Sequence, residues 1–186
     1  GNDLAAYMDG ASINVNGNVQ DATGNTMNGG EIIVHGRAGD ALGYAMRDGS
    51  VYIKSDVGYR CGIHMKEYRQ AKPAIIIGGC AGAFLGEYMA GGTLVLLGLG
   101  KNSNDSIVGQ CFATGMHGGV IYVRGIVPEA KLSKEVKVLE CNDEDIKQIS
   151  KYVKSYCKHF KTAYDDVMSE KFVKYQDLNF LFFNQI

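Results

Sequence analysis

Residues 24–36 read GNTMNGGEIIVHG and residues 43–55 read GYAMRDGSVYIKS, so two stretches follow the same pattern nineteen residues apart. In each stretch, a glycine stands three residues before a methionine and another stands three residues after it. A short run with apolar residues at alternate positions then follows. Because such alternation is typical of a β-strand, each stretch predicts one strand preceded by a glycine turn.

The same pattern continues on both sides of these two stretches. The spacing of nineteen residues holds as far as Met65, and the pattern resumes twice after insertions at residues 66–72 and 101–106, which predict loops. The repeated methionines are Met8, Met27, Met46, Met65, Met89 and Met116; the glycines before them are Gly24, Gly43, Gly62 and Gly86, with Ala5 and Ala113 in the first and last repeats. Two apolar columns follow: Ile13, Ile32, Val51, Ile75, Leu94 and Ile121, and then Val15, Val34, Ile53, Ile77, Leu96 and Val123.

A period of two nested in a period of about nineteen predicts an all-β fold, a single-stranded parallel β-helix of about 19 residues per coil. Successive coils stack at about 4.8 Å, so the methionines form a buried column. The glycines are expected at the corners, because a left-handed backbone costs glycine little. A left-handed hexapeptide solenoid fits less well, because no six-residue repeat is visible. Residues 1–8 already form the second half of a coil, so further coils are expected upstream.

The repeats end near Gly125, which predicts a β-helical region at residues 1–126 and a C-terminal helical cap or tail at residues 127–186. Residues 142–160 predict an amphipathic helix with Asn142 as its N-cap and acidic residues in its first turn. Thr162 and Asp165 predict a second helix that ends near Lys171. The apolar face of the first helix holds Ile146, Ile149, Tyr152, Val153, Tyr156 and Phe160. A terminal cap is expected because an open end of the stack exposes core and strand edges, and FLFFNQI at residues 180–186 is expected to pack on the protein.

Composition and motifs exclude several classes of function. A net charge of -1 gives no reason to expect nucleic acid, and no apolar run is long enough to span a membrane. The chain has no GxSxG, no HExxH and no N-terminal cysteine of a glutaminase. The cysteines predict free thiols in a reducing cytoplasm because they are odd in number and widely spread; they are Cys61, Cys80, Cys111, Cys141 and Cys157.

Several polar residues gather around the later methionines, namely His64, Lys66, Glu67, Glu87, Tyr88 and His117. His64 and Tyr88 hold the same position in consecutive repeats, so they are expected to stack. Lys66 and His117 share another position two repeats apart, and both positions should face outward. The set predicts either a ridge that docks a partner or binds an anion, with Arg60 adding charge, or a hydrogen-bonded ladder that stabilises the wall. A metal site of His64, His117 and Cys61 has no tight spacing to support it.

Five segments carry a resemblance to a known family: GNVQDATGNTMNGG (17–30), HGRAGDALGYAMRDG (35–49), VGYRCGIHMKEY (57–68), GEYMAGGTLVLLGL (86–99) and GQCFATGMHGGVIYVRG (109–125). They resemble the glycine (GXGXG) repeats of the C-terminal domain of the glutamate synthase large subunit. The segment at residues 57–68 resembles the form in which this domain is a separate short protein. The same repeat is also found in one of the subunits of formylmethanofuran dehydrogenase.

The resemblance implies a right-handed parallel β-helix that acts as a structural spacer. Its expected partners are glutaminase-type and FMN synthase-type subunits, and the FMN and iron-sulfur cluster are expected on those partners. The resemblance gives this chain no catalytic, cofactor-binding or metal-binding residue. Two alternatives stay open: a subunit of a formylmethanofuran dehydrogenase-like complex, and a β-helix with its own small-molecule site. Association of copies into a homo-oligomer also stays open.

Overall fold

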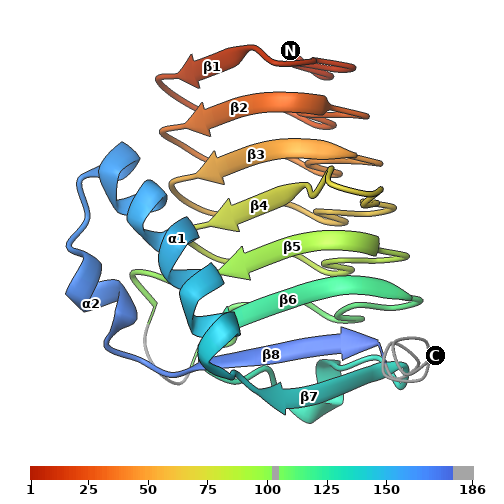
Figure 1. Cartoon of the computed structure of the whole chain (residues 1–186), viewed down its shortest axis with the longest axis vertical. Helices are drawn as coiled ribbons and strands as arrows, with labels where there is room; N and C mark the ends of the chain where they lie inside the picture. Colours follow the sequence, from red (N-terminus) through yellow and green to blue (C-terminus); the bar gives the residue numbers. More distant parts are fainter. Residues whose placement is uncertain (102–104, 178–186) are drawn as a thin grey trace.

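A computed structural model describes residues 1–101 and 105–177, and a mostly parallel sheet of eight strands dominates it (Figure 1). The sheet order is β1-β2-β3-β4-β5-β6-β8-β7. The first six strands are therefore stacked in chain order, and each pairs in parallel with the next. They are β1 (Ser12–Val15), β2 (Asn28–Val34), β3 (Asp48–Ile53), β4 (Ala74–Ile77), β5 (Ala90–Leu96) and β6 (Gly118–Arg124).

The strand register confirms both apolar columns. Ile13 pairs with Ile32, Ile32 with Val51, and the column continues in step to Ile121. The methionine column is also confirmed, because Met27, Met46, Met65 and Met89 are fully buried and Met116 is 1% exposed. Met8 belongs to the first repeat and is only partly buried. The inner face of the stacked strands is therefore covered by packed apolar side chains.

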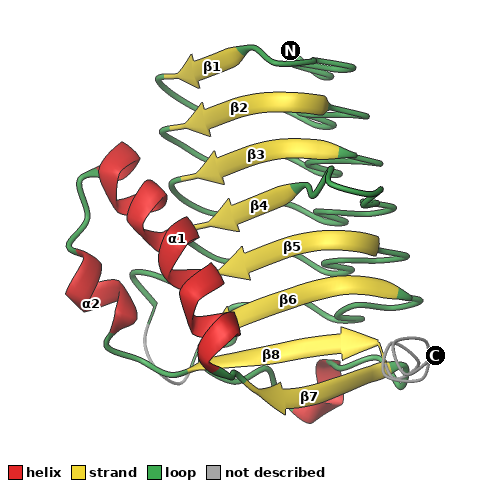
Figure 2. Cartoon of the chain, viewed as in Figure 1, coloured by secondary structure: helices red, strands yellow, loops and turns green. Residues whose placement is uncertain are grey.

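Behind the strands, a second layer of each repeat is also hydrogen-bonded to its neighbours (Figure 2). Every second residue there has a left-handed backbone, as at Ala22, Gly24 and Thr26. The N–H of Gly24 donates to Leu4 of the preceding repeat, whereas the N–H groups of Ala22 and Thr26 donate to the following repeat. The predicted corner glycines Gly24, Gly43, Gly62 and Gly86 have φ of 74°, 67°, 73° and 71°. The sequence located these glycines but missed the left-handed residues on either side of them.

The helix predicted at residues 142–160 is confirmed as α1 (Asp143–Phe160), and Asn142 caps it in a capping box with Asp145. Its position corrects the expectation of a terminal cap, because α1 lies along the flank of the sheet (Figure 1). The predicted apolar face is also wrong at one residue, because Ile146 is 41% exposed. The buried helix residues pack on side chains from the outer face of five strands, Ile33, Tyr52, Ile76, Val95 and Tyr122.

Two strands that the sequence did not predict continue the sheet past β6. β8 (Phe172–Asp177) pairs antiparallel with β6, and β7 (Val136–Glu140) pairs antiparallel with β8. The edge of the last repeat is thus covered by strands rather than by a helix. The second predicted helix is shorter than expected, because α2 spans Tyr164–Met168 with Ala163 as its N-cap. A 3-10 helix at Glu129–Lys131 lies between β6 and β7.

Two of the remaining predictions fall wholly or partly on residues that the structure does not describe. Part of the loop at 101–106, and all of FLFFNQI at 180–186, lie outside the described residues. The division of the chain at residue 126 stays a prediction. All five cysteines are free, as predicted.

The N-terminus of α1 is fixed to the sheet by Asp145, which is 6% exposed. Its Oδ1 accepts hydrogen bonds from the Tyr122 hydroxyl at 2.6 Å and from Lys174 Nζ at 2.8 Å. Its Oδ2 accepts the N–H of Asn142 at 2.9 Å. Burial raises the pKa of Asp145, but these hydrogen bonds outweigh burial, so its pKa is below the ordinary value. One carboxylate therefore joins α1, β6 and β8.

Farther along α1, the helix approaches the sheet closely at Gly78. A Cβ at this position would collide with the Tyr156 hydroxyl and with the carbonyl oxygen of Lys54, which are hydrogen-bonded to each other. Gly78→Ala is therefore expected to displace the helix and to destabilise the protein by about 2 kcal/mol. Thermal or urea unfolding measures this loss. Gly29→Ala is the matched control, because its Cβ would meet only Asp9 Oδ1 at 3.1 Å and Gly10 N at 3.4 Å; equal losses in both variants would contradict the role of Gly78.

Candidate functional site

The outward-facing side chains at the predicted ridge include a stack of three rings, which we call the aromatic stack: Tyr44, His64 and Tyr88. The His64 and Tyr88 rings are stacked, with centroids 5.3 Å apart and planes 14° apart, as their shared position predicts. Tyr44 contacts His64 edge-on at 5.9 Å. The Tyr88 ring also fills the space that a Cβ on Gly115 would need. Tyr44 and Tyr88 are still 40% and 45% exposed, so the stack is ordered and accessible.

Arg60, the residue expected to add charge to the ridge, is held by two neighbouring side chains. Its Nε donates to Glu87 Oε2 at 2.9 Å, and its guanidinium lies 4.8 Å from the centroid of the Phe84 ring. Glu87 is only 7% exposed. The structure therefore places Glu87 beneath the surface, where it supports Arg60, rather than among the outward side chains. The expectation that Arg60 adds positive charge did not include either of these two contacts.

Three further ridge residues, Lys66, Glu67 and His117, have different surroundings. The carboxylate of Glu67 accepts the N–H of Gly92 at 2.9 Å, so this side chain holds two repeats together. Lys66 and His117 are exposed, and Ala90 occupies their shared position in the repeat between them. His117 Nδ1 lies 3.1 Å from the carbonyl oxygen of Gly115. The six predicted residues thus combine four exposed side chains with two carboxylates that support the wall, the half-buried Glu67 and the buried Glu87.

The possible metal set of His64, His117 and Cys61 is not brought together in the structure. Cys61 is fully buried and burial raises its pKa, whereas His64 is exposed. In residues 1–101 and 105–177, no three His, Cys, Asp or Glu side chains are placed to hold a metal ion.

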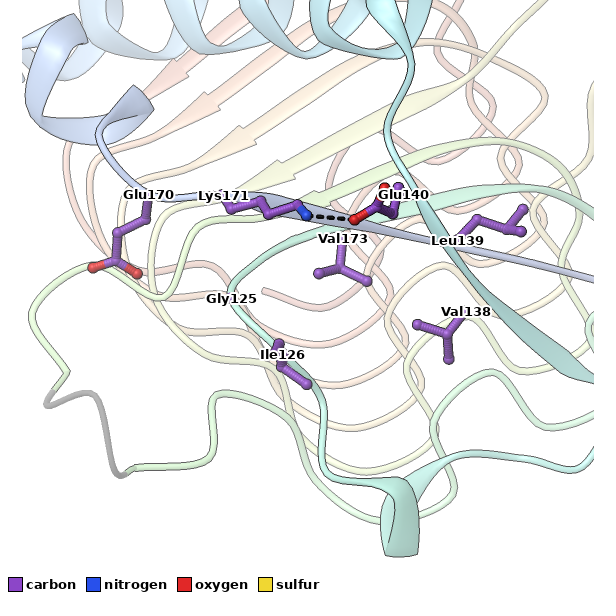
Figure 3. Close-up of a pocket in the computed structure, with 8 residues that line it drawn as sticks. All are labelled: Gly125, Ile126, Val138, Leu139, Glu140, Glu170, Lys171 and Val173. Carbon is purple, nitrogen blue, oxygen red and sulfur yellow. Dashed lines mark hydrogen bonds and ion pairs between the residues drawn. The ribbon is translucent and has the colours of Figure 1, made fainter.

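A second surface, which the sequence did not predict, is an apolar groove of about 470 Å³ beside the antiparallel strands. Figure 3 shows Ile126, Val138 and Val173 directed toward one another, with Lys171 and Glu140 paired at its rim. Lys171 Nζ lies 2.6 Å from Glu140 Oε1, and this hydrogen bond lowers the pKa of Glu140. Ile126 is 79% exposed and Val138 is 49% exposed. The sequence indicates this groove only weakly, because the groove depends on pairing between strands that lie far apart in the chain.

The stacked repeats, the corner glycines and the methionine column define a class, the glycine-repeat proteins with one parallel strand per repeat. The chain belongs to the GXGXG motif family, whose family model matches residues 1–182 and links the chain to domains of the glutamate synthase type.

A comparison with curated proteins gives a relative that is similar over most of this chain. The chain is 52% identical over 167 residues to the uncharacterized protein MJ1350 of Methanocaldococcus jannaschii. The match covers 89% of this chain but 64% of the relative, so the chain spans less than two thirds of that protein. None of the helices in the described residues is long and apolar enough to cross a membrane.

Proposed function

We propose that the protein is a non-catalytic assembly module of a glutamate synthase-type oxidoreductase. It holds a glutaminase-type subunit against an FMN synthase-type subunit in the cytoplasm. The FMN and iron-sulfur cluster belong to the partner subunits, and this chain binds neither of them. The observation that carries the proposal is the aromatic stack, an exposed surface whose side chains are already fixed in place.

The fold that we infer for this module is a right-handed parallel β-helix. Three features support it: the parallel register of β1 to β6, the hydrogen-bonded second layer, and a filled interior. Parallel bridges join Ala38 to Val57, Val57 to Ala81 and Ala81 to Val108 on another side of the repeats. A stack of this kind is a rigid spacer, because each repeat is hydrogen-bonded to the next on more than one side.

A fixed aromatic surface suits a binding role on energetic grounds. Rings that are ordered before binding lose little conformational freedom when a partner covers them. Aromatic side chains also dominate the energetic centres of many interfaces. The aromatic stack offers apolar area, and the half-exposed Arg60 guanidinium, held by Glu87 and Phe84, offers hydrogen-bond donors that are already fixed in place.

The double variant His64→Ala, Tyr88→Ala tests this role. Binding to the FMN synthase-type subunit is expected to weaken by about thirtyfold, which corresponds to about 2 kcal/mol. The free energy of unfolding is expected to fall by only about 1 to 2 kcal/mol, because both side chains are exposed. Titration of the labelled module with the partner measures the first quantity, and urea unfolding measures the second.

Tyr7→Ala is the matched control, because Tyr7 holds the same position in the first repeat, is 70% exposed and lies outside the aromatic stack. It should leave binding unchanged. Unchanged partner binding in the double variant, together with a collapse of stability, would make the aromatic stack a structural ladder and would contradict the proposed role. Capture of molybdopterin-binding subunits instead would favour the formylmethanofuran dehydrogenase-like complex.

A further inference from the structure

The insertion at residues 66–72 forms a tight hairpin rather than an open loop. Tyr68 and Ala71 exchange both backbone hydrogen bonds, at 3.1 and 3.0 Å, and Arg69 takes the left-handed conformation that closes the turn. The Arg69 guanidinium lies 5.0 Å from the centroid of the Tyr68 ring. The hairpin is thus a fixed element on the outside of the stack.

Both ends of the hairpin are anchored by acidic side chains. Glu67 accepts the N–H of Gly92 at 2.9 Å. Asp48 Oδ1 accepts the N–H groups of Gly49 at 2.8 Å and Lys72 at 3.2 Å. Each of the two carboxylates therefore has an oxygen directed at backbone N–H groups rather than at a basic side chain.

A cavity of about 400 Å³ lies beside this hairpin. Its size falls at the lower end of the range for pockets that hold small molecules. Its wall is made by Asn28, Arg47, Asp48, Lys66, Tyr68 and Ala71, and three of these side chains are charged.

Two positive charges at this cavity have no ion-pair partner among the described residues. Arg47 and Lys66 each follow a column methionine, so they occupy equivalent positions in consecutive repeats. Stacked repeats are about 4.8 Å apart, and like charges so placed repel each other. Neither side chain forms an ion pair with any carboxylate in residues 1–101 and 105–177. Two further cations, Arg69 and Lys72, belong to the hairpin itself.

We propose that this cavity binds a small organic or inorganic anion that carries a carboxylate or phosphate group. The Arg47 guanidinium suits a two-pronged contact with such a group, and Lys66 adds a second positive charge. The Asn28 amide and the Tyr68 hydroxyl supply neutral hydrogen-bond donors. Asp48 also lines the cavity, which favours an anion that carries a hydroxyl or amino group beside its acid group. The site is separate from the aromatic stack and does not depend on the proposed assembly role.

Titration of the isolated full chain tests the site, with inorganic phosphate and malate as separate probes and glycerol as the neutral control. Backbone amide NMR shifts are expected to saturate at one site with a dissociation constant in the millimolar range or below, centred on residues 47–49 and 66–72. Stronger binding of malate would assign the site to hydroxycarboxylates, and stronger binding of phosphate would assign it to phosphate groups. Shifts that saturate with neither anion by about 50 mM would overturn the proposal.

The double variant Arg47→Gln, Lys66→Gln should weaken binding of the better probe at least about tenfold. Its matched control is Arg37→Gln, Lys54→Gln, which removes two exposed cations that do not line the cavity and should bind as the parent does. Equal weakening in both double variants would mean a general charge effect and would overturn the site.

A second readout needs no ligand. Because the two cations repel each other, the cavity variant should melt at the same temperature as the parent or higher at low salt, and this difference should shrink as salt screens the charges. A clear fall in its melting temperature would instead make the two cations structural and would overturn the proposal.

Discussion

Replacing Met46 with lysine is expected to unfold the protein. Met46 is fully buried in the middle of the methionine column, packed among apolar residues of the stack. A lysine there must either keep an unpaired charge or lose its proton, and losing it at pH 7 costs about 5 kcal/mol. Natural domains are stable by about 5 to 15 kcal/mol, so this single change removes much or all of the stability. Circular dichroism with urea or thermal unfolding measures the loss.

Met46→Leu provides the control, since it nearly conserves volume and should cost less than about 1.5 kcal/mol. A Met46→Lys protein that melts within a few degrees of the parent would show that position 46 faces water. The assignment of the methionines to the interior would then be wrong.

Asp145→Ala is expected to destabilise the protein by about 3 to 5 kcal/mol. The change leaves the Lys174 ammonium without its partner, although the Lys174 side chain is only 15% exposed. The Tyr122 hydroxyl also loses its 2.6 Å hydrogen bond to Asp145, and the N–H of Asn142 loses its acceptor. Urea unfolding gives the magnitude. Asp143→Ala removes another acid from the first turn of α1, one that is exposed, and should cost no more than about 1 kcal/mol.

The combined variant Asp145→Ala, Lys174→Met tests whether the unpaired charge of Lys174 causes most of this loss. Removing both members of a buried pair is often close to neutral, so this variant should recover much of the lost stability. If Asp145→Ala costs no more than Asp143→Ala, the buried pair does not hold α1 in place.

The lowered pKa of Asp145 sets the pH at which this contribution disappears. Its folded-state pKa lies below the value of about 3.9 expected in the unfolded chain. The stabilisation is therefore fully present well above pH 4 and is lost as pH falls from there through the folded-state pKa. The difference in stability between the parent and Asp145→Asn should accordingly shrink below about pH 4.

Much of the repeat region could be predicted from the sequence because each of its strands pairs with the next strand along the chain. A period of nineteen residues fixes which residues lie above one another, so the columns from Ile32 to Ile121 matched the strand register. The second buried face was missed, although its signal was present. Runs such as EIIV (31–34), AIII (74–77) and VIYV (120–123) are nearly continuous in apolar residues, which is typical of parallel strands covered on both faces.

The features that the sequence did not predict depend on contacts between segments that lie far apart in the chain. β8 lies between β6 and β7 in the sheet, so β7 does not pair with β6, the strand that precedes it in the chain. Asp145 was predicted only as a favourable acid at a helix start, and nothing local indicated that Tyr122 and Lys174 would surround it. Glu87 lies two residues from buried Leu85 and Met89, and only its pairing with Arg60 explains its burial.

The position of α1 has a consequence for how the molecule folds. In a simple array of repeats, each repeat contacts only its neighbours, so the ends open independently. Here one helix packs across β2 to β6, and the hydrogen bond from Tyr156 to Lys54 joins residues 102 positions apart. Closing so long a loop is slow, so we expect the helix to dock after the repeats have formed. Once docked, it is expected to couple the five repeats of β2 to β6 into one cooperative unit, whereas β1 contributes no residue to the core around the helix.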